Sequence, residues 1–318
     1  MNKPGVILIT TLLVILIMSV ISTQISKTFM LSMQREMYMD FSNTSYQLLL
    51  SAEAQAIKKI QQEMKMYSTK LKSEDSLLKN GMYYPIGTRT LQISVKDAGN
   101  CFNLNSLFTP KQGKYELNKS QKEWLERLLR LKEVDEINIQ SLLDQLIDWV
   151  DKDNQPRNYG AENYFYTGPG SSIKQFTSKR LLAHLSEIKS LPIIDQFDFY
   201  ALTEGICVLP YSNRQNININ TLNVSNALLL ASFFAENNLE FVESEILDFP
   251  EEGYDNIDSF IKKFPEANKY PRQVLGTNSR IFQLKSQLHD KNIIAELETL
   301  VILDISNQSK VLNRNFNL

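Results

Sequence analysis

Oxygen-bearing side chains gather in one stretch of the 318-residue chain, LIDWVDKDNQPRNYGAENY at residues 146–164. Four of them follow the spacing of a calcium-binding loop, at offsets 1, 3, 5 and 12: Asp151, Asp153, Gln155 and Glu162. Hard oxygen ligands of this kind favour Ca²⁺. Pro156 stands where an EF-hand needs glycine, so the stretch predicts a calcium site of another type.

A simpler interpretation of the same stretch is a solvated turn in which aspartates cap a helix. The pattern predicts a helix over Asn138–Val150, and Asp148 lies inside it, where its role would be structural. Both interpretations place the loop directly after this helix, so the position of the loop does not decide between a calcium site and a capped turn.

Other chemistry finds little support in the residues. The chain has two histidines, His184 and His289, and two cysteines, Cys101 and Cys207. The cysteines are too few for a disulfide scaffold and show no zinc-site spacing. The sequence contains no nucleophile elbow, P-loop or HExxH motif. A formal net charge of −2 also lacks the basic excess of nucleic-acid-binding proteins.

Two pairs of asparagines alternate with apolar residues, Asn103 with Asn105 and Asn218 with Asn220. Ligand binding is one interpretation of such clusters. We favour a structural one, in which buried amides satisfy backbone groups where the chain enters and leaves helices.

The chain opens with an apolar segment, MNKPGVILITTLLVILIMSVISTQISK, that has no charged residue between Lys3 and Lys27. A helix over Pro4–Ser26 is long enough to cross a hydrocarbon core of about 30 Å. The apolar run starts directly after Gly5, whereas a secretory signal is cleaved after its apolar run. The segment therefore predicts a membrane anchor whose N-terminus faces the cytoplasm. A cleaved secretory peptide and a plain signal anchor are the alternatives.

The elements that position these features change from helix to strand and back along the chain. No proline or glycine lies between Val6 and Gly81, which predicts one helix from Val6 to about Tyr67. Further helices are expected at Asn138–Val150, Ser178–Ser190, Ile194–Thr203, Ser225–Glu236, Asn256–Lys263, and Ser120–Leu131 with Ser120 as its N-cap. Strands are expected at Thr90–Val95 and in a closing antiparallel hairpin of Arg280–Leu288 and Ile293–Ile305. This order predicts an α+β fold in which a helical block interrupts a sheet domain.

The acidic stretch resembles the K-type minor pseudopilin of the type II secretion system (the general secretion pathway protein K family), whose pattern is D-W-x-D-x-D-x-x-P-R…G-A-E-x-x-Y. Further family-like segments follow in chain order: Asp97–Leu107 (DAGNCFNLNSL), Leu185–Leu191 (LSEIKSL), Val208–Pro210 (VLP), Ile217–Thr221 (ININT) and Ser279–Phe282 (SRIF). Their joint order makes the resemblance specific. Gly5 before the apolar run is similar to the start of prepilins.

The resemblance implies a domain layout. Residues 1–5 would be a prepilin leader, cleaved between Gly5 and Val6, with methylation of the new N-terminus. Residues 6–26 would form the transmembrane and pilus-core helix. Residues 27–105 and 276–318 would form a pilin-like antiparallel sheet domain, and residues 106–275 an inserted helical domain of two SAM-like units.

The resemblance also concerns the candidate site. The family binds calcium in its helical domain, so the expected ligands are Asp151, Asp153, Gln155, Glu162 and Asn163. Gln155 and Asn163 are amides where the family has acidic residues, which should weaken binding. Cys101 and Cys207 lie in family-like segments at the border of the helical block, which implies a disulfide in an oxidising periplasm. Two buried free thiols are the alternative.

The implied function is that of a minor pseudopilin at the tip of the pseudopilus, without a catalytic role, that initiates pseudopilus assembly for protein export across the outer membrane. Two features favour the tip. Thr10 stands where most pilins carry a Glu that neutralises the N-terminal amine of a neighbouring subunit. The inserted domain is also too bulky for the shaft of such a fibre.

Expected partners are the I- and J-type minor pseudopilins, the major pseudopilin, prepilin peptidase and the inner-membrane assembly platform. The chain is expected to cross the inner membrane once, with its C-terminal globular part in the periplasm, and to reach the pseudopilus tip after assembly. One alternative function is a tip minor pilin of a type IV pilus, acting in adhesion. Another is a membrane-anchored periplasmic hydrolase that uses the acidic loop.

Overall fold

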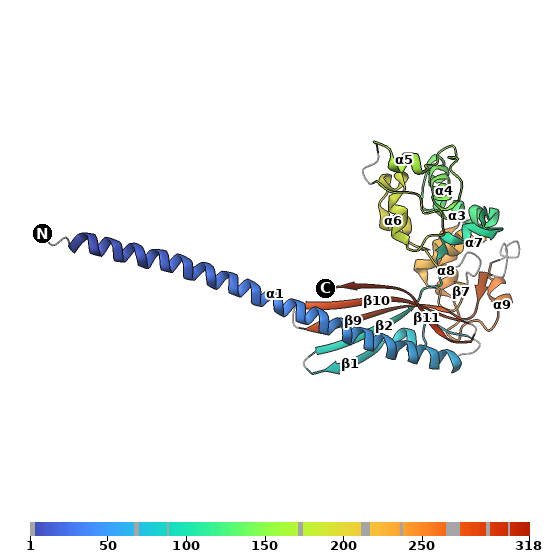
Figure 1. Cartoon of the computed structure of the whole chain (residues 1–318). Helices are drawn as coiled ribbons and strands as arrows, with labels where there is room; N and C mark the ends of the chain where they lie inside the picture. The colour runs from blue at the N-terminus through green and yellow to red at the C-terminus, as the bar shows by residue number, and fades with distance from the viewer. Residues whose placement is uncertain are drawn as a thin grey trace.

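The structure, a computed structural model, describes residues 4–66, 70–87, 89–170, 174–210, 217–235, 238–264, 274–290, 293–304 and 306–318. Its longest element is α1, Pro4–Met66, a helix of 63 residues that confirms the predicted N-terminal helix. Side chains from Ile7 to Asp40 are exposed, and from Phe41 onward α1 packs against the rest of the chain (Figure 1). At 1.5 Å per residue, the exposed part extends about 50 Å.

A five-stranded antiparallel sheet covers the C-terminal half of α1 (Figure 1). In spatial order its strands are β1 (Met82–Ile86), β2 (Arg89–Asp97), β9 (Ile281–Asp290), β10 (Ile293–Leu303) and β11 (Ser309–Asn317). The predicted closing hairpin is confirmed, since β9 and β10 pair from Asp290↔Ile293 to Ile281↔Ile302. Burial alternates along β2, β9 and β10, which gives the sheet one apolar face toward α1.

The two edge strands, β1 and β11, are not predicted by the sequence pattern. Strand β1 contains Pro85, a residue that sheets tolerate at an edge but not in a central strand. Strand β11 is exposed along most of its length, so it lacks the apolar alternation that marks a strand in a sequence.

The helix and the sheet share one hydrophobic core. Its buried side chains include Leu49, Ala56 and Ile60 from α1, and Leu91, Ile93, Phe282, Leu284, Leu297 and Val301 from the sheet. An ion pair with a buried carboxylate links the helix to the sheet at this core. Glu53 of α1 is 3% exposed, and its carboxylate accepts hydrogen bonds from Arg314 of β11 at 2.7 and 2.8 Å and from Thr299 at 2.6 Å. The last strand is thereby fastened to the long helix.

A second hydrophobic core runs from Phe102 to Leu275, and we call this part of the chain the helical unit. It lies beside the sheet, off the axis of α1 (Figure 1). Its first half contains the hairpin β4 (Phe108–Lys111) and β5 (Lys114–Leu117) and the helices η1 (Leu104–Leu107), α3 (Lys119–Leu131), α4 (Glu136–Val150), α5 (Asn163–Thr167), η2 (Leu185–Ser190), η3 (Pro192–Gln196) and α6 (Phe199–Thr203).

The second half of the helical unit contains η4 (Val224–Asn226), α7 (Ala227–Phe234), α8 (Leu239–Leu247) and α9 (Ile257–Ile261). Short parallel strand pairs join distant segments, namely β3 (Phe102–Asn103) with β6 (Ile206–Cys207), and β7 (Ile217–Asn218) with β8 (Leu275–Gly276). A short helix, α2 (Ser76–Lys79), precedes the sheet.

Several predicted helices need correction. Helix α3 has Asn118 rather than Ser120 as its N-cap, because the Asn118 side chain accepts the Gln121 N–H. The helix predicted over Ser178–Ser190 is wrong in its first half. Only η2 is helical there, since the backbone before it bonds to α4 and α5 instead. The segment predicted as one helix over Ile194–Thr203 is divided between η3 and α6. The sequence pattern does not predict helix α8.

Candidate functional site

The acidic loop connects α4 to α5, at the end of the helical unit away from the sheet (Figure 1). Asp151 is the C-cap residue of α4, and Glu162 is the N-cap residue of α5. Together with Asp153, they bring carboxylate oxygens within 4.8 Å of one another. Three of the predicted metal ligands therefore meet in space.

Two buried oxygens of this cluster lack a hydrogen-bond partner among the described residues. Glu162 is fully buried, and its Oε1 has no hydrogen-bond partner among the described residues, nor has Oδ1 of Asp151. Burial raises the pKa of the Asp151 carboxyl, and the nearby charges of Asp153 and Glu162 raise it further. A bound divalent cation would supply the missing partner and offset the repulsion. The donor set therefore fits Ca²⁺, which prefers carboxylate and carbonyl oxygens.

Asp148 lies inside α4, as predicted, and its side chain bonds to the backbone of the loop. Its carboxylate is fully buried, and Oδ2 accepts the backbone N–H of Arg157 at 3.1 Å. The Arg157 Nε lies 3.7 Å from Oδ1. Burial is the main cause that raises the pKa of Asp148 to about 6. Gly160 packs so closely here that a Cβ atom would lie 1.9 Å from Oδ2. Asp148 thus folds the loop back onto its own helix.

The two predicted amide ligands hold the loop in shape. Gln155 donates its backbone N–H to Oδ1 of Asp153 at 2.9 Å, while its side chain is exposed. The side-chain oxygen of Asn163 accepts the backbone N–H and the hydroxyl of Thr177, at 2.8 and 2.9 Å. Asn163 therefore attaches the following segment to the start of α5.

Sequence reasoning missed Lys179, a cation at this site. Its Nζ lies 3.1 Å from Oε2 of Glu162 and donates to the backbone carbonyl of Asp153. Lys179 follows Glu162 by 17 residues, across an irregular segment. No local spacing connects the two residues, so the sequence alone carries no signal for this contact.

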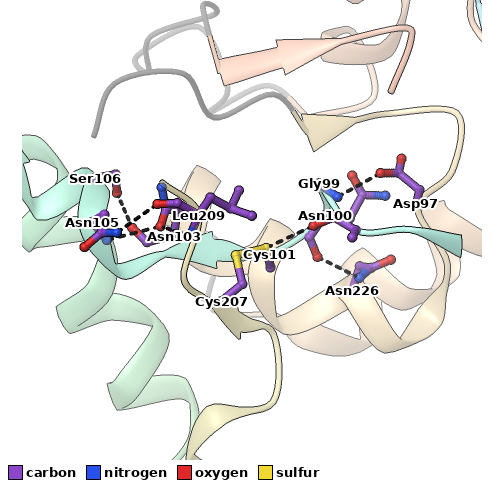
Figure 2. The surroundings of a disulfide bond; sticks show 11 residues. Asp97, Gly99, Asn100, Cys101, Asn103, Asn105, Ser106, Cys207, Leu209 and Asn226 are labelled. Atoms are coloured by element: carbon purple, nitrogen blue, oxygen red, sulfur yellow. Dashed lines mark hydrogen bonds between the residues drawn. A yellow bond between two sulfur atoms is a disulfide. The ribbon is translucent and has the colours of Figure 1, made fainter. Parts of the chain in front are cut away.

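A disulfide joins Cys101 to Cys207, with Cα atoms 5.8 Å apart (Figure 2). Cys101 directly precedes β3, and Cys207 is the last residue of β6, the strand that pairs with β3. The bond links positions 106 residues apart and so encloses the first half of the helical unit, including the acidic loop.

The asparagine pairs serve the backbone, as the structural interpretation predicts. Figure 2 shows Asn103, whose Oδ1 accepts the N–H of Leu209 at 2.9 Å and of Asn105 at 3.1 Å. The Nδ2 of Asn105 donates to the carbonyl of Leu209 at 2.8 Å. Asn218 and Asn220 make similar bonds where the helical unit meets the sheet domain.

The N-terminal helix carries the other predicted feature, the leader junction. Gly5 and Val6 lie in the first turn of α1, and the structure describes their backbone only. The Thr10 hydroxyl donates to the Ile7 carbonyl at 2.9 Å, so it is satisfied within its own helix. Among the described residues, Ile7–Lys65 is the helix long and apolar enough to cross a membrane, with a mean hydropathy of 2.3 in its most apolar window. This fits a single-pass anchor.

Comparisons with known proteins agree with this geometry. The family model for protein K of the type II secretion system matches residues 100–211. Type II secretion system protein K of Aeromonas hydrophila is 23% identical over 303 residues, which cover 93% of this chain and 89% of that protein. Its counterpart in Dickeya chrysanthemi is 31% identical over 147 residues, 44% of this chain and 39% of that protein.

A solved structure shows the same fold. It is the crystal structure of the GspK-GspI-GspJ complex from the type 2 secretion system of enterotoxigenic Escherichia coli. One of its chains aligns with a TM-score of 0.71 at 23% identity, covering 87% of this chain and 98% of that chain. The family match spans both cysteines and the acidic loop. Residues 100–211 thus match the protein K family of the type II secretion system, and the relatives and the solved fold together support a minor pseudopilin of that system.

Proposed function

We propose that this minor pseudopilin occupies the tip of the pseudopilus and initiates its assembly. The size and position of the helical unit carry this proposal, since its described residues lie off the axis of α1, beside the sheet (Figure 1). In a pilin-like fibre the long helices pack side by side, and each sheet domain lies close to its neighbours. A body of this size leaves little room for a further subunit above it, so the chain fits the end of the fibre.

Thr10 supports the same position independently. A Glu at this place would need the N-terminal amine of a neighbouring subunit, because an unpaired carboxylate in lipid is costly. The Thr10 hydroxyl already donates to the Ile7 carbonyl. The helix therefore enters the membrane without a charge that needs a partner, as expected of a subunit with nothing above it.

The predicted leader implies how the chain would be processed and held in the membrane. Prepilin peptidase would cut between Gly5 and Val6, and methylation would follow at the new N-terminus. Before assembly, α1 would hold the chain in the inner membrane, with the sheet and the helical unit in the periplasm. The disulfide of Cys101 and Cys207 suits that oxidising compartment.

The partners are proposed from the relative. The solved complex combines GspK with GspI and GspJ, so we assign the I- and J-type minor pseudopilins as the first partners of this chain. The major pseudopilin would join below them, at the inner-membrane assembly platform. The exposed length of α1, from Ile7 to Asp40, offers the apolar surface on which other helices would pack.

We also propose a structural Ca²⁺ in the acidic loop, held by Asp151, Asp153 and Glu162. The ion would neutralise three carboxylates and fix the end of α4 to the start of α5. A cavity of about 190 Å³ lies beside Asp151 and Asp153, and its described lining contains no serine, cysteine or histidine. That composition favours a structural role over the hydrolase alternative.

Immunogold electron microscopy tests the tip position. Pseudopili would be overproduced in cells that carry this chain with a C-terminal epitope, then sheared and labelled. We expect gold at one end of each fibre, whereas an epitope on the major pseudopilin, as the control, should label the whole length. Gold spaced along the shaft would refute the tip position. Labelled fibres that still form and adhere in cells without the secretion genes would favour a type IV pilus.

A further inference from the structure

We propose that Lys179 is a built-in cation that competes with calcium for the acidic loop, so that the helical unit folds both with and without the metal. This inference rests on the calcium site proposed above and concerns how the chain regulates that site.

The Lys179 ammonium uses oxygens that a metal ion would also need. It lies 3.1 Å from Oε2 of Glu162 and donates to the carbonyl of Asp153. The Glu162 side chain is 1% exposed, and its Oε1 is buried without a partner among the described residues. An ammonium offers donors only, and two cations beside one buried carboxylate repel each other. Calcium therefore binds only after the Lys179 side chain leaves.

The backbone fixes Lys179 at this place. Its N–H donates to the carbonyl of Trp149 at 3.1 Å, and Thr177 is bonded to the side chain of Asn163. Trp149 stands two residues before the first aspartate of the loop, and Asn163 directly follows its glutamate. The segment is thus attached at both ends of the loop, and the side chain of Lys179 has a short path to the carboxylates.

The backbone conformation of Lys179 strengthens the argument. Its φ angle is +51°, in the left-handed region where a side chain adds strain and glycine fits best. A lysine stands at a position whose backbone favours glycine, and its ammonium reaches a buried carboxylate. The ion pair with the buried carboxylate of Glu162 offsets this strain.

Charge balance in the loop leads to the same conclusion. Arg157 is 44% exposed and lies beside Asp148, whereas Lys179 contacts the fully buried Glu162. Without metal, Lys179 is thus the cation that balances the deepest carboxylate of the cluster.

The test compares Lys179→Met with wild type and with a matched control, Lys152→Met. Lys152 lies between the two aspartates in sequence and donates to the Gly113 carbonyl, so its loss removes the same charge from the same loop without a contact to Glu162. The full chains, in detergent and stripped of metal with EDTA, are titrated with CaCl₂ by isothermal calorimetry. We expect Lys179→Met to bind Ca²⁺ at least about tenfold more tightly, and Lys152→Met to stay within about twofold of wild type.

Thermal unfolding gives the second measurement. In EDTA, Lys179→Met should melt below wild type, and Ca²⁺ should restore its Tm; folding only with Ca²⁺ would also support the proposal. Equal affinity of wild type and Lys179→Met would overturn the competition and leave the calcium site intact. If neither chain binds Ca²⁺, both the site and the competition are wrong. If Lys179→Met stays unfolded in Ca²⁺, Lys179 is a structural residue only, and the competition is again refuted.

Discussion

Replacing both Cys101 and Cys207 by serine should destabilise the helical unit by about 2–5 kcal/mol. The cross-link joins residues 106 positions apart. For a loop near this length, the loss of chain entropy in the unfolded state corresponds to about 4.7 kcal/mol, and native contacts around the bond reduce or add to that figure. The parallel pair of β3 and β6 remains in the variant, so the loss should act mainly through the unfolded chain.

Tryptophan fluorescence isolates this effect. The chain has two tryptophans, Trp124 and Trp149, which are 2% and 4% exposed and both lie in the helical unit. Urea titrations of the full chain in detergent would therefore follow the unit that the disulfide encloses. The control is wild type reduced with dithiothreitol, which should unfold at the same urea concentration as the double variant. If both unfold within about 0.5 kcal/mol of the oxidised wild type, the bond is not the constraint that we infer.

Three further predictions concern buried charge and close packing. Arg314→Met should destabilise the sheet domain by about 3 kcal/mol, because it leaves Glu53 charged and buried without its partner; an unchanged melt by circular dichroism would contradict this. Gly160→Ala should lower the urea midpoint of the helical unit by an amount equal to about 1–3 kcal/mol, since its Cβ would overlap Asp148, whereas Gly170→Ala has open space and should be neutral; equal effects would refute the close approach. In EDTA, stability should fall as pH rises from about 4 through 6, because the folded state holds a proton on Asp148, whose pKa is about 6, that the unfolded state has lost; urea midpoints that rise over this range would contradict it.

The long N-terminal helix and the central strands of the sheet are predictable because each carries a clear signal in the sequence. Helix α1 lacks proline and glycine from Val6 onward, and β9 and β10 alternate apolar and polar residues around a polar break. The edge strands lack that signal, since β11 has little buried surface. The irregular segment before η2 escaped prediction because its backbone bonds are to distant helices rather than to its own neighbours.

The candidate site also contains residues that the sequence predicts and residues that it does not. Asp151, Asp153 and Glu162 were predictable because they lie within one stretch of chain with a recognisable spacing. Lys179 was not, because its position depends on how the following segment returns to the end of α4. The amides Gln155 and Asn163 show a related limit, since spacing alone does not separate a ligand from a residue that holds the loop.

The central claim is that this chain enters a pilin-like fibre through its processed N-terminal helix. Intact-mass and peptide mass spectrometry of the chain purified from membranes tests it most directly, in cells with and without prepilin peptidase. We predict that the mature chain begins at Val6 with a methylated amine, and that it keeps residues 1–5 when the peptidase is absent. A cut at any other position, or an uncut chain in cells that have the peptidase, would contradict the account.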